Sequence, residues 1–200
     1  MHGLWIARKI AVLLVWLVGF TLHGASQEKE KYETIQATAY GTSTQLGQIV
    51  PITVIIYRFS MPADLGVLVK AFREGQNQGL VNALQKTRAV GRIQIPGEVG
   101  FDLSYISKIP TPNGRKIRFV ASRKIAFGEA LANSRSENFN LTAGELDMND
   151  QNQGKSTGTI FPATQLIINP QGELQFYLYR NPWRLGEIRD SNPISSAATP

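Results

Sequence analysis

The segment RKIRFVASRKIAF, residues 115–127, decides the fold class because its side chains alternate between two chemical types. The apolar positions of one set are Ile117, Phe119, Ala121, Ile125 and Phe127. The positions of the other set are Lys116, Arg118, Val120, Ser122 and Lys124. Successive side chains of a strand point to opposite faces. The segment therefore predicts a half-buried strand with one core face and one basic face.

Similar patterns extend in both directions from this segment. Strands are predicted over residues 32–41, 49–60, 89–95, 101–109, 139–148, 157–168, 173–180 and 184–189. Turn sequences such as Pro-Gly, Asn-Gly and Gln-Gly separate most of them. Residues 49–60, IVPITVIIYRFS, are apolar on both alternating sets, which predicts that both faces of that strand are covered.

One region follows a helical period instead. Leu65, Leu68, Val69 and Phe72 recur at helical spacing, and a shorter version of the pattern follows Gly79. We expect a helical hairpin over residues 62–88, broken between Gly75 and Gly79. Together these patterns predict a mainly β (α+β) domain. Its architecture is expected to be an antiparallel sandwich or open barrel of about eight or nine strands with that hairpin inserted.

The N-terminus resembles a signal peptide. Arg8 and Lys9 precede an apolar run over residues 10–20, and small residues follow it. The run is shorter than the roughly 20 apolar residues of a spanning helix, which argues against an uncleaved anchor. We therefore predict a signal peptide at residues 1–25, a single domain at 26–190 and a disordered tail at 191–200. The mature protein is expected in the periplasm or the medium, with no membrane span.

Composition excludes several classes of site. The chain has no cysteine, and its histidines, His2 and His23, both lie in the predicted signal peptide. Disulfides, thiolate metal sites and Ser-His-Asp or Cys-His catalysis are therefore excluded from the mature chain. Removing Arg8 and Lys9 from the 21 basic residues leaves 19 against 15 acidic ones, a charge of +4. So small an excess does not favour nucleic-acid binding, and no sequence motif predicts a cofactor.

Three groups of residues are candidate binding sites. The first is the basic face of residues 115–127, formed by Lys116, Arg118 and Lys124. This face would suit an anionic envelope component or glycan. The alternative is a solvated strand face protected by charge. Arg123 falls on the apolar set and would need an acidic partner or a bulge.

Aromatic residues near the C-terminus form the second group. Tyr177 and Tyr179 alternate along one predicted strand, with Trp183 close by, and would offer a platform for sugar rings. Ordinary cross-strand packing explains the same pattern.

The third group consists of Asp147, Asn149 and Asp150, whose oxygens would suit a weak calcium site. A polar hairpin tip is the alternative, since Asn and Asp form turns through their own hydrogen bonds.

Several short motifs also resemble those of a group of small exported bacterial proteins of unassigned function. They are EGQ at 74–76, VGRI at 90–93, DL at 102–103, GRKI at 114–117, SRKIAF at 122–127 and PWRL at 182–185. The resemblance implies a single exported domain and carries no catalytic or binding residues.

The sequence therefore favours an exported, non-catalytic β-rich module that binds or acts as a scaffold. Two alternatives stay open. One is a carboxylate-dependent hydrolase of an envelope polymer, for which Asp102, Glu129, Glu145 and Glu187 are available. The other is a carrier of a small apolar ligand in a barrel lumen. The oligomeric state is also left open.

Overall fold

The computed structural model describes residues 32–121, 123, 141–180 and 182–191, without the side chains of residues 178–180. The predicted signal peptide, the predicted tail and residues 124–140 therefore lie outside the described residues. The described part contains nine strands, one long helix and two short 3-10 helices. The strands are β1 Glu33–Tyr40, β2 Ile49–Ile56, β3 Gly91–Gln94, β4 Phe101–Thr111, β5 Gly114–Ala121, β6 Leu141–Asn149, β7 Thr157–Ile168, β8 Leu174–Arg180 and β9 Trp183–Asp190. The helices are η1 Ser43–Gln45, α2 Pro62–Lys86 and η3 Gln153–Lys155.

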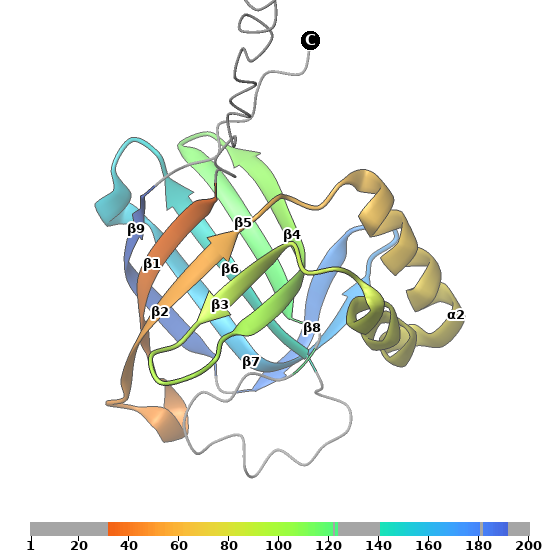
Figure 1. The fold of residues 1–200 in the computed structure, drawn as a ribbon, viewed down its shortest axis with the longest axis horizontal. Helices are drawn as coiled ribbons and strands as arrows, with labels where there is room; N and C mark the ends of the chain where they lie inside the picture. The colour runs from red at the N-terminus through yellow and green to blue at the C-terminus, as the bar shows by residue number, and fades with distance from the viewer. Residues whose placement is uncertain (1–31, 122, 124–140, 181, 192–200) are drawn as a thin grey trace, which may run out of the picture. The chain divides into compact units, whose positions relative to one another are not determined.

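The strands close into an antiparallel barrel (Figure 1). Neighbours follow the order β6-β5-β4-β3-β2-β1-β9-β7, and a pairing between β6 and β7 completes a ring of eight strands. The predicted mainly β, antiparallel class is confirmed. The sandwich and the open barrel are both wrong, because the β6–β7 pairing removes the sheet edges that either would keep.

The ninth strand, β8, lies outside this ring. Ile160 of β7 pairs with Trp183 of β9, and Ala163 pairs with Arg180 of β8. The strands β8 and β9 therefore follow one another along the same edge of β7, with β8 ending at Arg180 and β9 beginning at Trp183. The second half of β7 and β8 form a hairpin that extends past the ring, and Figure 1 shows it beside α2.

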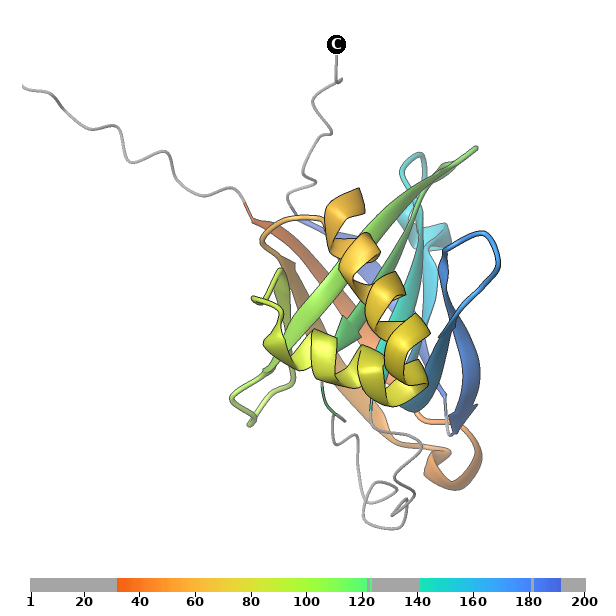
Figure 2. The ribbon, with the colours of Figure 1, turned by 90° about the vertical axis from the view of Figure 1, so that its right-hand side faces the viewer.

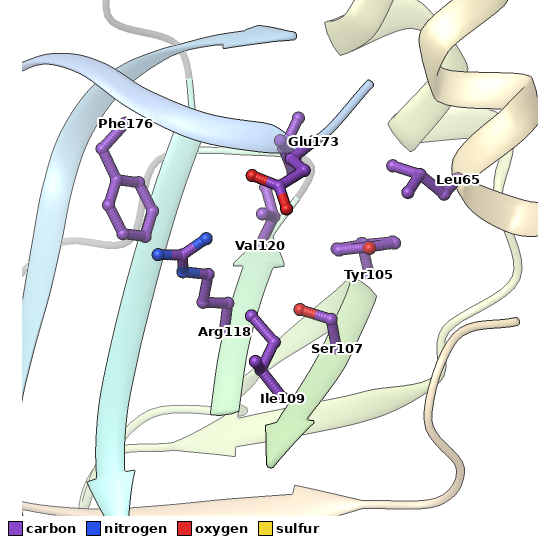
Figure 3. Close-up of a pocket in the computed structure, with 9 residues that line it drawn as sticks. Leu65, Tyr105, Ser107, Ile109, Arg118, Val120, Glu173 and Phe176 are labelled. Atoms are coloured by element: carbon purple, nitrogen blue, oxygen red, sulfur yellow. The ribbon is translucent and has the colours of Figure 1, made fainter. Parts of the chain in front are cut away.

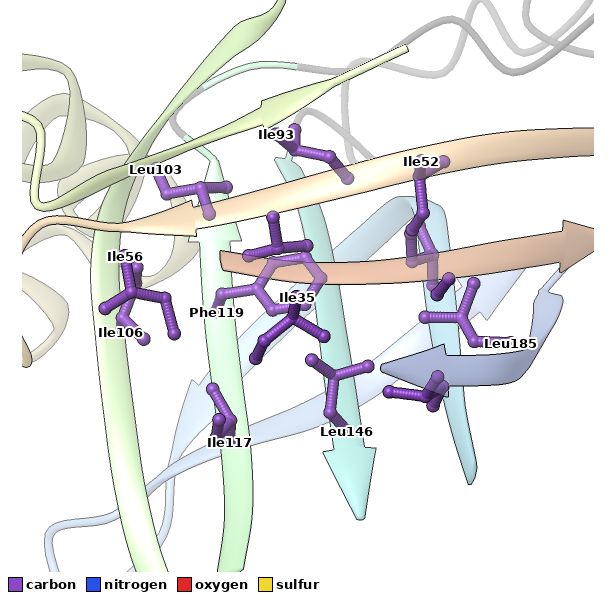
Figure 4. Packing of buried hydrophobic residues seen from close by; sticks show 14 of the residues in the cluster. Ile35, Ile52, Ile56, Ile93, Leu103, Ile106, Ile117, Phe119, Leu146 and Leu185 are labelled. Carbon is purple, nitrogen blue, oxygen red and sulfur yellow. The ribbon is translucent and has the colours of Figure 1, made fainter. Parts of the chain in front are cut away.

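Side chains fill the interior of the barrel. The apolar face of β5 contributes Ile117 and Phe119, which pack against Ile35 of β1 and Leu146 of β6 (Figure 4). All four are fully buried. Phe119 lies across from Gly144, where a Cβ atom would come within 2.1 Å of the aromatic ring. The apolar side chains Ile117 and Phe119 of the segment 115–127 therefore face the core, as predicted.

Helix α2 packs against the outside of the barrel. Its Leu68, Leu80 and Leu84 join a second apolar cluster with residues of β4 to β7, such as Tyr105 and Leu166. The helix is interrupted at Gly75 and Gln76, whose backbone angles are not helical. The predicted break is confirmed, but the structure has one kinked helix in place of two antiparallel ones, and Figure 2 shows its halves at an angle.

The outer face of β2 corrects another prediction. Inward-facing Ile52, Val54 and Ile56 are buried, but Ile49 on the outer face is 63% exposed. Helix α2 packs mainly against β4 and β7. The β-branched residues on the outer face of β2 therefore reflect the preference of such side chains for strands, and they do not show that this face is covered. Among the described residues, no helix is long and apolar enough to cross a membrane.

Candidate functional site

A groove runs along the outer face of the barrel where the basic face of β5 meets the β7–β8 hairpin (Figure 3). We call it the outer groove, and its cavity volume is about 170 Å³. Five residues from the barrel wall form its floor: Tyr105, Ser107, Ile109, Arg118 and Val120. They come from β4 and β5, whose register pairs Tyr105 with Val120 and Ser107 with Arg118.

The opposite side of the outer groove comes from α2 and the hairpin. Leu65 lies in the first turns of α2, Glu173 directly precedes β8, and Leu174 and Phe176 lie in the first part of β8. Phe176 packs against Phe161 of β7, with ring centroids 4.8 Å apart. Most of the lining is therefore apolar, and the charged side chains in it are Arg118 and Glu173.

Arg118 is held in place by its neighbour on β6. Its Nε donates to Oε2 of Glu145 at 2.7 Å, and its guanidinium lies 5.9 Å from the ring centroid of Phe176. Its two terminal nitrogens have no hydrogen-bond partner in the described part of the chain, and the side chain is 28% exposed. Arg118 can therefore donate to a ligand without leaving Glu145.

Glu173 lies across the outer groove from Arg118. Its Oε2 accepts from the Asn169 side chain at 3.1 Å. No ion pair joins Glu173 to Arg118 in the described part, and Figure 3 shows both side chains pointing into the groove. The groove thus presents a hydrogen-bond donor on one side and an acceptor on the other.

Glu145 neutralises much of the predicted basic face. Lys116 donates to its Oε1 at 2.8 Å, in addition to the Arg118 bond. Burial raises the pKa of the Glu145 carboxyl, but the hydrogen bonds from Lys116 and Arg118 outweigh burial and hold the pKa below its ordinary value. Glu145 is therefore an ionised partner of two cations, and this pairing does not favour an anionic ligand.

Tyr105 supplies a polar atom at the floor of the groove. Burial raises the pKa of its phenol, while a hydrogen bond with Ser107 acts in the opposite direction. The phenol is therefore neutral at physiological pH. It is a hydrogen-bonding group and not a source of charge.

A second hollow of about 360 Å³ lies on the other side of Phe176. Glu145 and Asp147 of β6, Thr157 and Thr159 of β7, and Arg184 of β9 line it. The register places Arg118, Glu145, Thr159 and Arg184 in one row across four strands. Charges of both signs therefore alternate over this part of the barrel wall.

The remaining predicted site residues lie apart from one another. Trp183 is fully buried in the barrel interior, whereas Tyr177 is 56% exposed on β8. Trp183 therefore shares no surface with Tyr177. Lys124 and the side chain of Tyr179 lie outside the described residues.

The proposed calcium ligands are used by the hairpin itself. Asn149 Oδ1 accepts from the backbone N–H groups of Gln151 and Asn152 at 3.2 and 2.8 Å. Asp150 accepts from Arg115 at 2.7 Å, and Asp147 is exposed on β6. Within the described residues, no three acidic or histidine side chains gather in a way that would hold a metal.

Arg115 is a site residue that the sequence analysis did not single out. It contacts carboxylates of Glu33, Asp150 and Asp190, and Glu33 is fully buried. Burial lowers the pKa of the guanidinium, but these three carboxylates outweigh burial and raise it. Its position on the apolar set of β5 was the available signal, because a charge there needs buried partners. Arg123 is exposed and lies 5.0 Å from the ring centroid of Phe101.

Comparison with protein-family models, with curated proteins and with solved structures finds no match to this chain. The geometry of the groove is therefore the basis for a functional proposal.

Proposed function

We propose that the protein is an exported, non-catalytic binding module, and that its ligand occupies the outer groove. The ligand has an apolar group of about the size of one aromatic ring, since cavities near 150 Å³ hold benzene and the groove measures about 170 Å³. Beside that group it carries a neutral polar unit with both a donor and an acceptor, such as an amide.

The observation that supports the amide is the pair formed by Arg118 and Glu173. The free terminal nitrogens of Arg118 suit a carbonyl oxygen, and the carboxylate of Glu173 suits an N–H group. A ligand of either charge would meet one like charge in the groove, which costs free energy. Mixed charges therefore favour a neutral ligand over the anionic polymer expected from the sequence.

The two alternatives from the sequence have less support. A carrier needs room in the lumen, and the residues along the described interior are fully buried against one another. A carboxylate-dependent hydrolase needs a carboxyl group with a raised pKa as general acid. Glu145 has a lowered pKa, Asp102 lies 4.0 Å from Arg92, and Glu187 accepts from Thr38 at 2.7 Å. Glu129 lies outside the described residues.

The test is a titration of the protein with N-acetylphenylalaninamide, followed by NMR. A molecule of about 15 heavy atoms at roughly 0.3 kcal/mol per atom corresponds to a Kd on the order of a millimolar. We expect 3-phenylpropionate and 3-phenylpropylamine, which carry single charges, to bind more weakly than the neutral amide. Equal binding of all three compounds would contradict the role of the mixed charges.

Matched variants locate the site. Arg118→Gln is expected to weaken binding about tenfold, because hydrogen bonds to charged groups contribute about 1.5 kcal/mol or more. The control is Arg189→Gln, an exposed arginine of β9 outside the groove. Equal effects of both substitutions, or no binding of the amide at all, would refute the proposal.

Export is tested separately by the intact mass of protein recovered from the producing cell. Removal of the predicted signal peptide gives a mass well below the 22.1 kDa of the full chain. A full-length mass in the membrane fraction would contradict the export part of the proposal.

A further inference from the structure

The strand that borders the outer groove has an edge that no described strand covers. β8 pairs with β7 and stands last in the strand order. Every other strand of the described barrel has a partner on each side. An uncovered edge offers N–H and C=O groups to another extended chain.

The hairpin turn fixes which backbone groups point outward from this edge. Asn169 N–H donates to the carbonyl of Glu173 at 3.0 Å, so these two residues form a hydrogen-bonded pair. Hydrogen-bonded pairs alternate along an antiparallel ladder. Gln175 therefore directs its backbone groups toward Ile167 of β7, and Leu174 and Phe176 direct theirs away from β7.

Leu174 and Phe176 also line the outer groove. The uncovered backbone groups and the apolar pocket are therefore contributed by the same two residues. An extended chain placed along this edge would lie in the groove, with its backbone beside β8 and alternate side chains toward the floor.

Two features indicate that the edge is built for pairing. Unused edges are usually protected by lysine, proline or an inward charge. Residues Leu174, Gln175 and Phe176 include none of these, and the irregularity of the β7–β8 ladder comes after Phe176. Arg118 adds a donor for the carbonyl of a peptide group of the incoming chain, and Glu173 adds an acceptor for its N–H group.

We propose that the ligand of the outer groove is an extended peptide segment of a partner protein, which adds to β8 as an antiparallel strand. This inference rests on the proposed function and names the ligand class for the same groove. The segment carries an apolar side chain of leucine or phenylalanine size at alternate positions. Residues opposite each other in an antiparallel ladder share a face. The apolar peptide residues are therefore those whose N–H groups bond to Leu174 and Phe176.

The probe is the five-residue peptide Thr-Leu-Thr-Phe-Thr. Its N-terminus is acetylated and its C-terminus is amidated. N-methylation of the leucine or the phenylalanine removes an N–H group that faces β8. Each such methylation is expected to lower affinity about three- to tenfold, the usual contribution of one backbone hydrogen bond. N-methylation of the central threonine, which faces away from β8, is the matched control and is expected to leave affinity nearly unchanged.

Amide hydrogen exchange gives a second measurement on the unmodified protein. In the free protein, Leu174 and Phe176 are expected to exchange rapidly and Gln175 slowly. At a peptide concentration of ten times Kd, exchange at Leu174 and Phe176 should slow about tenfold. Phe176→Ala should weaken peptide binding, and Tyr177→Ala, at an exposed residue of β8 that does not line the outer groove, should not.

Several outcomes would overturn the inference. Slow exchange at Leu174 and Phe176 in the free protein would mean that the edge is already covered. If the protection of these amides from exchange rises with protein concentration, a second copy of the protein covers the edge. If the protection does not depend on concentration, another part of the same chain covers it. Equal effects of all N-methyl groups would exclude strand pairing. Binding of N-acetylphenylalaninamide without any gain from the longer peptide would refute this inference and leave the proposed function standing.

Discussion

Arg115 and Arg118 lie three residues apart on the same strand and have opposite environments. Arg115 faces the interior, is 14% exposed and contacts three carboxylates from other parts of the chain. Arg118 faces outward, contacts one carboxylate and keeps two terminal nitrogens without a described partner. Because a largely buried cation needs opposite charges around it, Arg115 is committed to holding β5, β1 and β9 together through Glu33 and Asp190. The outward arginine remains able to bind a ligand.

The largest difference between these two arginines should appear in stability. Arg115→Met removes a cation that contacts the buried carboxylates of Glu33 and Asp190, and we expect a loss of about 3–5 kcal/mol. Arg118→Met should cost about 1 kcal/mol or less, as for partly exposed ion pairs. Urea denaturation of both variants measures the difference. Equal losses would contradict the division between a structural and an available arginine.

A methyl group added inside the barrel and one added on helix α2 should have opposite effects on stability. Gly144→Ala places a methyl group against the ring of Phe119 in the interior, and we expect a loss of about 1–3 kcal/mol. The control is Gly66→Ala in α2, where the new methyl group meets nothing within 4 Å beyond the adjacent backbone of the helix itself. Helix propensity predicts that this control is stabilised by about 0.5–1 kcal/mol. Thermal unfolding compares them, and a neutral Gly144→Ala would mean that the interior has spare room.

The smallest effect concerns pH. Because the pKa of Glu145 is lowered in the folded protein, its pairing stabilises the fold above the ordinary glutamate pKa of about 4.5. That stabilisation is lost as the pH falls through the folded-state value. Glu145→Gln should therefore lose less stability between pH 5 and pH 3 than the natural protein, by about 0.2–1 kcal/mol. The reverse order in urea titrations would argue against the pairing of Glu145.

Local patterns were sufficient to predict most of the elements. Alternation in β5 placed Ile117 and Phe119 inside, and the break at Gly75 was visible because glycine weakens a helix. Closure of the ring was not predictable in this way. Closure depends on the pairing of β6 with β7 and on β9, which pairs with both β1 and β7. No local residue pattern determines strand pairings between residues so far apart in the sequence.

The candidate site was predicted only in part. Arg118 was identified, but Glu145, Phe176 and Leu65 reach it from three separate elements. The prediction that Trp183 joins the tyrosines in one aromatic platform was wrong. The alternation of side chains along a strand does not continue into the next strand once the strand is interrupted. The break between β8 and β9 separates Tyr177 from Trp183, and the latter enters the barrel core.

A ligand that binds outside a filled barrel should perturb methyl groups of the outer groove and leave those of the interior unchanged. Methyl NMR measures this difference. The protein is labelled at isoleucine, leucine and valine methyl groups and titrated with N-acetylphenylalaninamide. We expect shifts at Leu65, Val120 and Leu174, which line the outer groove, and none at Ile35 or Leu146 inside the barrel. Shifts of the interior methyl groups, with Val120 and Leu174 unchanged, would contradict it.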